Sequence, residues 1–344
     1  MQTTQHRSAA RFLAEVLVAS YMGAIGLAAH LTGIYLLLFP ELAALSHDVM
    51  TGPQGKAASQ PGRIVLTPTL TAAAGLFITR HTSYGAISIS LIVLASLIIK
   101  LLGSAIGPAL SAGGLPMVLD ERSWMYPAAI LLGLTGLVVI LWMWQRYGPR
   151  LDTPSRYSWN DSPVIDELES APHDRFWVVT LLIFVLLLGV PAQLTGLRFI
   201  LFPPLIVMAY ELFGHPEIPG WMERPALFPL VCVLTACVGV VACHLCRSSA
   251  IGVMLTVLCS IAILRAFKVH MPPALAVGLL PFVMTAPNMR YALSVGIGTV
   301  ALTLCFCCRG SLRKYPREWQ TESARRTNGR PRPGAKTSQE PTRA

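Results

Sequence analysis

Two pairs of charged residues stand at matching positions in the two halves of this 344-residue chain. Lys100 and Arg265 align at an offset of 165, within LIIKLLG and AILRAFK, and Asp48 and Glu211 align at an offset of 163. Burying a charged side chain inside an apolar span costs free energy, so such a residue is a candidate for a functional role. A cationic side chain there can bind an anion, and a carboxyl group can carry a proton. The spacing therefore predicts one anion-binding pair and one proton-coupling pair.

Prolines frame a short apolar segment in each half. Pro108 and Pro116 enclose about nine residues, as do Pro273 and Pro281, and a helix of that length covers about 13 Å, under half of the hydrocarbon core of a bilayer. Pro108 and Pro273 are predicted to begin half-helices, and Pro116 and Pro281 to end them. The free N–H groups at such a beginning suit an anion.

Lys268 and His270 stand just before Pro273 and add positive charge to the predicted anion site. Structural alternatives remain open. Lys100 and Arg265 could reach the headgroups from helix ends, the proline-framed segments could be kinked helices or loops, and Asp48 and Glu211 could sit at the membrane surface.

The matched residues belong to a duplicated unit. LTGIYLLLFPELAALSHDVMTGP at 31–53 parallels LTGLRFILFPPLIVMAYELFGHP at 194–216, and GPALSAGGLPMVL at 107–119 parallels PPALAVGLLPFVM at 272–284. Duplicated membrane units tend to build a binding site between the copies. The duplication predicts a site at the interface of the two halves.

Composition indicates a membrane protein. Hydrophobic residues make up 53% of the chain and charged residues 13%, against about 25% charged in soluble domains, and apolar runs such as 178–190 approach the length of a span. We predict an all-α polytopic membrane protein with two homologous four-helix repeats, each with two short broken or re-entrant segments. The expected spans are 14–38, 64–80, 84–102 and 124–145, then 177–201, 226–245, 249–267 and 289–308.

The expected organisation is a first repeat at 1–146, a hydrophilic linker at 147–175, a second repeat at 176–308 and a basic disordered tail at 309–344. The tail has ten Lys or Arg against three Glu, a net charge of +7, and such a composition cannot bury a core. No nucleic-acid partner is expected for the tail, whereas contact with membrane lipid suits its charge. All eight cysteines lie in the second repeat, without a spacing that predicts a metal or other cofactor.

Lysine and arginine near the span ends set the orientation. Four spans per repeat would place Arg11, Arg80 and Arg146 on one side and Arg122 and Arg290 on the other. If one of the broken segments crosses, each repeat has five spans and the two repeats are inverted, with both termini still on the same side. We therefore expect a multi-pass protein of the cell (inner) membrane with both termini cytoplasmic.

The second half resembles the HPP family of integral membrane proteins. LFPPLIVMAYELFGHPE, a following ERP, LTACVG and HMPPALAVGLLPFV carry the resemblance, which covers most of 176–308 and, more weakly, 14–146. In place of the His-Pro-Pro that names the family, this chain has Met271-Pro272-Pro273. The resemblance implies four spans per unit and a link to nitrite transport.

The predicted function is a secondary transporter or permease for a small inorganic, nitrite-like anion, bound near the midplane between the repeats. An anion channel and a non-catalytic scaffold are the alternatives. A membrane-embedded enzyme is disfavoured because the histidines show no metal or nucleophile spacing, and no nucleotide-binding loop is present. Whether the chain forms a homo-oligomer stays open.

Overall fold

The structure is a computed structural model that describes residues 2–55, 57–103, 107–148, 176–215, 224–246 and 250–312, without the side chains of 2–8, 99–103 and 309–312. Contacts divide the chain into two units, Met1–Cys305 and Phe306–Ala344, and the candidate site lies in the first. The described residues form twelve α-helices and no strand, which confirms the all-α prediction. The predicted linker and tail lie almost entirely outside the described residues, and the predicted repeat boundaries stay predictions.

Seven helices are long and apolar enough to cross a membrane. They are α1 (Gln2–Thr32), α3 (Pro61–His81), α6 (Met125–Tyr147), α8 (Trp177–Thr195), α10 (Leu227–Cys246), α11 (Ala250–Phe267) and α13 (Met289–Leu312). Helix α4 (Ala86–Gly103) is also apolar, but its described side chains, Ala86–Ile98, make up a shorter apolar stretch than those seven helices. On α8 a stripe of Val179, Ile183, Leu187 and Leu194 is exposed; such a patch is unusual facing water but ordinary facing lipid. These helices support a multi-pass membrane protein.

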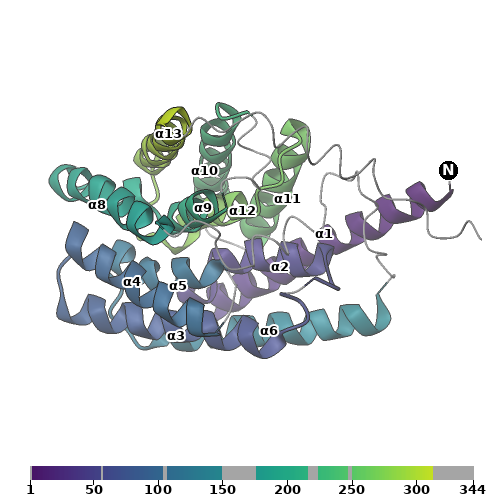
Figure 1. Cartoon of the computed structure of the whole chain (residues 1–344). Helices are drawn as coiled ribbons and strands as arrows, with labels where there is room; N and C mark the ends of the chain where they lie inside the picture. The colour runs from purple at the N-terminus through teal and green to yellow at the C-terminus, as the bar shows by residue number, and fades with distance from the viewer. Residues whose placement is uncertain are drawn as a thin grey trace, which may run out of the picture. The chain divides into compact units, whose positions relative to one another are not determined.

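Four short helices lie at the centre of the first unit (Figure 1). They are α2 (Glu41–Thr51), α5 (Pro108–Leu119), α9 (Pro203–Gly214) and α12 (Pro273–Leu279). Helix α2 contacts α5, α5 contacts α9, α9 contacts α12, and α12 contacts α2, so the four close into a ring that we call the short-helix ring. Nearly all of its residues are buried. Twelve residues of helix extend about 18 Å, too little to cross a bilayer.

The first helix of each half ends six residues before the predicted limit, at Thr32 and at Thr195. The following residues, Gly33 and Gly196, have φ values of 72° and 70°, a left-handed conformation that stops a helix and that glycine adopts without strain. A 3-10 turn follows in each half, η1 (Tyr35–Leu37) and η2 (Arg198–Leu201). Apolar length alone had extended these spans too far.

The prediction that Pro116 ends the first half-helix is wrong. Helix α5 continues through Pro116 to Leu119, and the left-handed Asp120 follows. In the second half α12 stops at Leu279, and Pro281 lies in the 3-10 turn η4 (Leu280–Val283). The predicted beginnings at Pro108 and Pro273 are confirmed.

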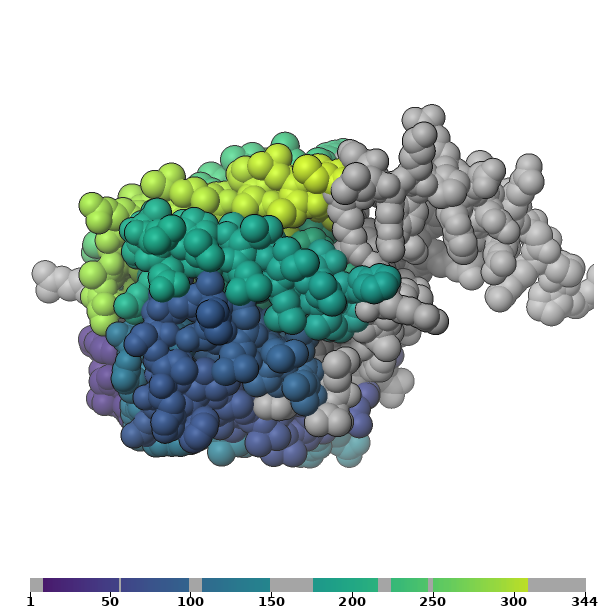
Figure 2. All heavy atoms as spheres, turned by 60° about the vertical axis from the view of Figure 1, so that its left-hand side comes forward, coloured from purple at the N-terminus to yellow at the C-terminus, as the bar shows by residue number. Residues whose placement is uncertain are grey.

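The two halves exchange their first helices. Helix α1 packs on α11 of the second half, with Gly26 facing Val253, and α8 packs on α4 of the first half, with Gly189 facing Ala86. Figure 2 shows the face where the blue atoms of the first half meet the teal atoms of α8. Each half thus contributes two long helices and two short helices to the interface.

The predicted sidedness of Arg80 is wrong. Its guanidinium lies over the Trp124 ring, 5.9 Å from the ring centroid, and Trp124 directly precedes α6, whose last turn holds Arg146. The 23 residues of α6 extend about 34 Å. Arg80 therefore shares an end of the unit with Arg122, and Arg146 lies at the other end.

The short segments explain this error, because they carry the chain between the two ends. Helix α2 finishes beside the end of α6, where Trp144 Nε1 donates a hydrogen bond to the Met50 carbonyl oxygen at 3.2 Å. Helix α1 starts near the same end, since the charge of Arg11 acts on His47 of α2. Helices α1 and α3 therefore run in the same direction, and the segment at 33–51 returns the chain between them.

Candidate functional site

An ion pair joins the two halves at the end of the unit where α1 begins. Arg265 Nη2, in the last turn of α11, lies 2.5 Å from Glu15 Oε2 on α1. The Glu15 side chain is only 7% exposed, whereas Arg265 is half exposed. Since α1 and α11 come from different halves, the pair forms only because the halves exchange their first helices.

Two histidines lie beside this pair. His47 on α2 and His270, just before α12, have ring centroids 6.5 Å apart. His47 is buried, and neither His47 Nδ1 nor His270 Nε2 has a hydrogen-bond partner within the described part of the chain. A buried polar nitrogen without a partner is costly, and an imidazole nitrogen can donate to an anion.

Arg11, one turn before Glu15 on α1, completes the group. Its charge acts on Glu15 and Arg265 and on both histidines. We call Arg11, Glu15, His47, Arg265 and His270 the charged cluster. It contains two guanidinium groups and two imidazoles against one carboxylate, so the cluster favours an anion.

The structure thus brings together only two of the six predicted anion-binding residues, Arg265 and His270. Lys268 is exposed and has a left-handed φ of 55°. Pro108 and Pro273 begin α5 and α12 as predicted. Lys100 belongs to α4, which packs on α8, and its side chain lies outside the described residues.

The two predicted proton-coupling acids occupy equivalent places. Asp48 on α2 and Glu211 on α9 are both half-buried, and each accepts a backbone N–H on its own carbonyl oxygen at the helix end, from Gly52 at 2.8 Å and from His215 at 2.9 Å. Glu211 Oε1 lies 3.6 Å from the position that a Cβ on Gly107 would take. Glu211 therefore faces the beginning of α5, across the interface between halves.

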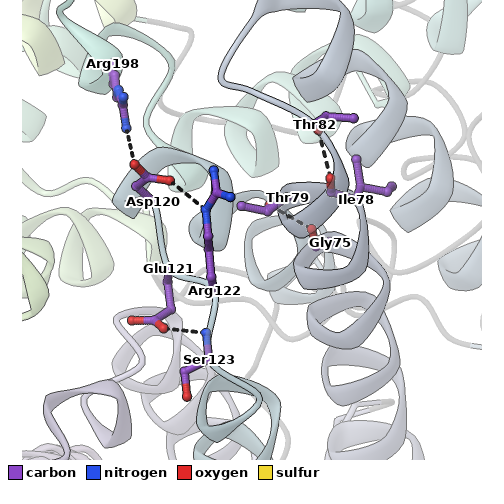
Figure 3. Close-up of polar contacts among 9 residues, drawn as sticks. All are labelled: Gly75, Ile78, Thr79, Thr82, Asp120, Glu121, Arg122, Ser123 and Arg198. Carbon is purple, nitrogen blue, oxygen red and sulfur yellow. Dashed lines mark hydrogen bonds and ion pairs between the residues drawn. The ribbon is translucent and has the colours of Figure 1, made fainter.

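The opposite end of the unit holds a second set of charges (Figure 3). Asp120 pairs with Arg122 at 3.4 Å and with Arg198 of the second half at 3.7 Å. The Arg198 guanidinium also lies 5.0 Å from the centroid of the Tyr84 ring. The side chains of the ion-paired residues are 39% to 56% exposed, so this set is a surface contact between halves rather than a buried site.

Tyr84 strengthens that surface contact. Burial raises the pKa of Tyr84 to about 12, although the Arg198 charge acts in the other direction. The phenol therefore keeps its proton near neutral pH and donates to the Arg198 carbonyl oxygen at 3.3 Å.

Sequence reasoning missed Arg11, Glu15 and His47 as site residues. One signal was available for Glu15, because an acid one turn after Arg11 in an otherwise apolar segment is unusual and calls for a partner. No sequence pattern places His47 opposite His270, since their contact depends on how α2 packs against α12.

No protein family model, characterised protein or solved structure matches this chain.

Proposed function

We propose that the protein is a permease for a small inorganic anion, such as nitrite, and that the anion binds at the charged cluster between the two halves. The observation that carries the proposal is the placement of two arginines around two histidines with unpartnered nitrogens, on helices from both halves. The site chemistry fits a compact anion, because the two guanidinium groups carry a permanent positive charge and donate hydrogen bonds, to which imidazole N–H groups can add.

Glu15 limits how strongly the cluster holds its ligand. Its carboxylate binds Arg265 at 2.5 Å, so an anion must share that guanidinium with a fixed internal anion. A transport site has to release its ligand as well as bind it. Because Glu15 neutralises part of the positive charge of the cluster, the anion is held loosely enough to be released, as transport requires.

The short-helix ring is the proposed route beyond the cluster. His47 on α2 and His270 at α12 connect the cluster directly to two members of the ring. Broken backbone at membrane depth is tolerated where protein covers it or where it lines a pathway, and the ring is covered by the long helices. The site then lies towards one end of the spans, because Arg11 and Arg265 are near helix ends, and not at the midplane.

Asp48 and Glu211 are proposed to exchange protons with the solution. Both are half-buried near the ends of short helices, where water can reach them more easily than it can reach the centre of the ring. Their equivalent positions suit a paired role in the two halves.

The wider assignment rests on the same proposal. Two homologous repeats of the HPP type, fused in one orientation, account for the matching order of long and short helices in the two halves. The proposed location is the cell (inner) membrane, with both termini cytoplasmic and lipid around the long helices.

Anion binding to purified protein tests the proposal. A ligand of the folded state raises stability by about 2.7 kcal/mol at a hundred times its Kd, so nitrite should raise the melting temperature of the wild type in detergent. Arg11→Gln should abolish this rise, and Arg146→Gln, which removes an exposed charge at the end of α6, should keep it. Equal stabilisation of Arg11→Gln and wild type would overturn the assignment of the site.

A further inference from the structure

One carboxyl group lies inside the short-helix ring, away from the charged cluster. Glu41 is the first residue of α2 and is 2% exposed. Its helix, α2, contacts α5 of the first half and α12 of the second half. An ionisable side chain at such a depth is rare in membrane proteins and commonly serves a proton pathway.

The hydrogen bonds of Glu41 are incomplete. Ser111 Oγ on α5 donates to Glu41 Oε1, and Glu41 Oε2 has no partner among the described residues. An ionised carboxylate is an acceptor at both oxygens, whereas a protonated one carries its own donor. The surroundings of Glu41 therefore satisfy one oxygen and leave the other able to take a proton.

Two tyrosines flank the carboxyl group without satisfying it. The charge of Glu41 acts on Tyr126 and on Tyr291. Tyr126 donates its hydroxyl to the Ala112 carbonyl oxygen of α5, and Tyr291 donates to the Val277 carbonyl oxygen of α12, both at 2.7 Å. Since these hydroxyl protons are already engaged, neither is free for Glu41 Oε2.

Few other titratable groups reach this position. Among the described side chains of the helices packed on α2, α12 has none that titrates, and α5 offers only the Ser111 hydroxyl. Helix α6 offers Tyr126. Helix α1 offers Tyr21, whose hydroxyl donates to the Gly133 carbonyl oxygen of α6, together with Arg11, which acts on His47 further along α2, and Glu15, which pairs with Arg265. No cation pairs with Glu41 in the described part of the chain.

The second half lacks this group. At the offsets that align the halves, Glu41 corresponds to Pro204 and Ser111 corresponds to Ala276. Gln at position 41 could also accept the Ser111 hydrogen bond, so a structural role alone does not require an acid. The ring thus contains the Glu41–Ser111 pair in the first half without a counterpart in the second half.

We propose that Glu41 is a proton-binding site at the centre of the short-helix ring. The carboxylate takes up one proton at Oε2 and becomes a neutral acid, and it returns that proton when it ionises; Ser111 keeps its hydrogen bond to Oε1 in both forms. The proposal deepens the proposed function, since it adds a buried proton site to the proton exchange proposed for Asp48 and Glu211, but proton binding itself can be measured without any transport.

Carbodiimide labelling tests the proton site directly. Dicyclohexylcarbodiimide reacts with protonated carboxyl groups in apolar surroundings, so peptide mapping of purified protein should find Glu41 modified, with less modification as the pH rises. Glu41→Gln should lose that labelled peptide, and Glu121→Gln, which changes an acid in the loop after α5, should keep it. Absence of labelling at Glu41 at every pH overturns the proposal, whether or not the protein transports anions.

Transport then separates the proton site from the anion site. An inward proton gradient should accelerate anion uptake by wild type, and Glu41→Gln should take up the anion at one rate with or without the gradient, while nitrite still raises its melting temperature. Glu41→Asp should keep part of the gradient response, since it keeps a carboxyl group. A gradient response in Glu41→Gln equal to that of wild type contradicts the proposal even if labelling succeeds.

Discussion

Arg265→Gln is expected to lower anion flux in proteoliposomes by at least about tenfold. A hydrogen bond to a charged group contributes about 1.5–3 kcal/mol, and 1.4 kcal/mol corresponds to about tenfold in an equilibrium constant. Arg265 joins α11 to α1 through its ion pair with Glu15. Arg265→Lys keeps the charge but loses the planar fork, so its flux should fall between those of wild type and Arg265→Gln.

A double variant separates transport from folding. Arg265→Gln leaves Glu15 buried without its partner, and removing one member of a buried pair destabilises a protein, whereas replacing both members can be nearly neutral. Glu15→Gln/Arg265→Gln should therefore melt close to wild type and still show low flux. Recovery of flux in the double variant would mean that Arg265 serves only to neutralise Glu15.

Gly75→Ala and Gly239→Ala are expected to destabilise the fold strongly. A Cβ on Gly75 would collide with the Gly113 carbonyl oxygen of α5, and a Cβ on Gly239 with the Gly278 carbonyl oxygen of α12. Relief requires moving the backbone of a short helix, and overpacking costs about 1–3 kcal/mol or more. We expect each variant to melt about 2–5 °C below wild type in detergent.

Gly62→Ala is the matched control on the same helix as Gly75. Nothing lies within 4 Å of a Cβ at Gly62, and alanine is the better helix former by about 0.8–1 kcal/mol. Its melting temperature should equal or exceed that of wild type. Equal melting of Gly62→Ala and Gly75→Ala would show that α5 does not pack closely on α3.

The helices follow from the sequence because apolar length and proline position act locally. Long apolar runs have no stable alternative to a helix in a membrane. Proline has a backbone φ suited to the first helical turn, and Pro108, Pro203 and Pro273 each begin a short helix. The duplication also predicts that each short segment of the first half has the same type of structure as its counterpart in the second half.

The charged cluster could not be predicted in the same way. Glu15 and Arg265 lie 250 positions apart, and they meet because the halves exchange their first helices, a choice of packing partner that no local pattern records. Glu41 was passed over for a different reason. The sequence prediction rests on residues shared by both copies, and Glu41 corresponds to Pro204, so that criterion excludes it.

The direction of the chain was the third failure. A count of the long apolar runs alone predicts that α1 and α3 are consecutive spans of opposite direction. That direction puts Arg80 on the same side as Arg146. The extended residues, the turn η1 and α2 together return the chain between α1 and α3. Because this segment consists of a 3-10 turn and a short helix rather than one long helix, its hydropathy profile does not resemble that of a membrane span, and the reversal of the chain is missed.

Uptake of a labelled small anion by proteoliposomes tests the central claim most directly. The account predicts that wild-type protein takes up nitrite or a similar anion saturably, faster than protein-free liposomes, and that Arg11→Gln/Arg265→Gln abolishes this uptake while Arg146→Gln retains it. Uptake no faster than in protein-free liposomes for every small anion, or wild-type uptake in the double variant, would contradict it.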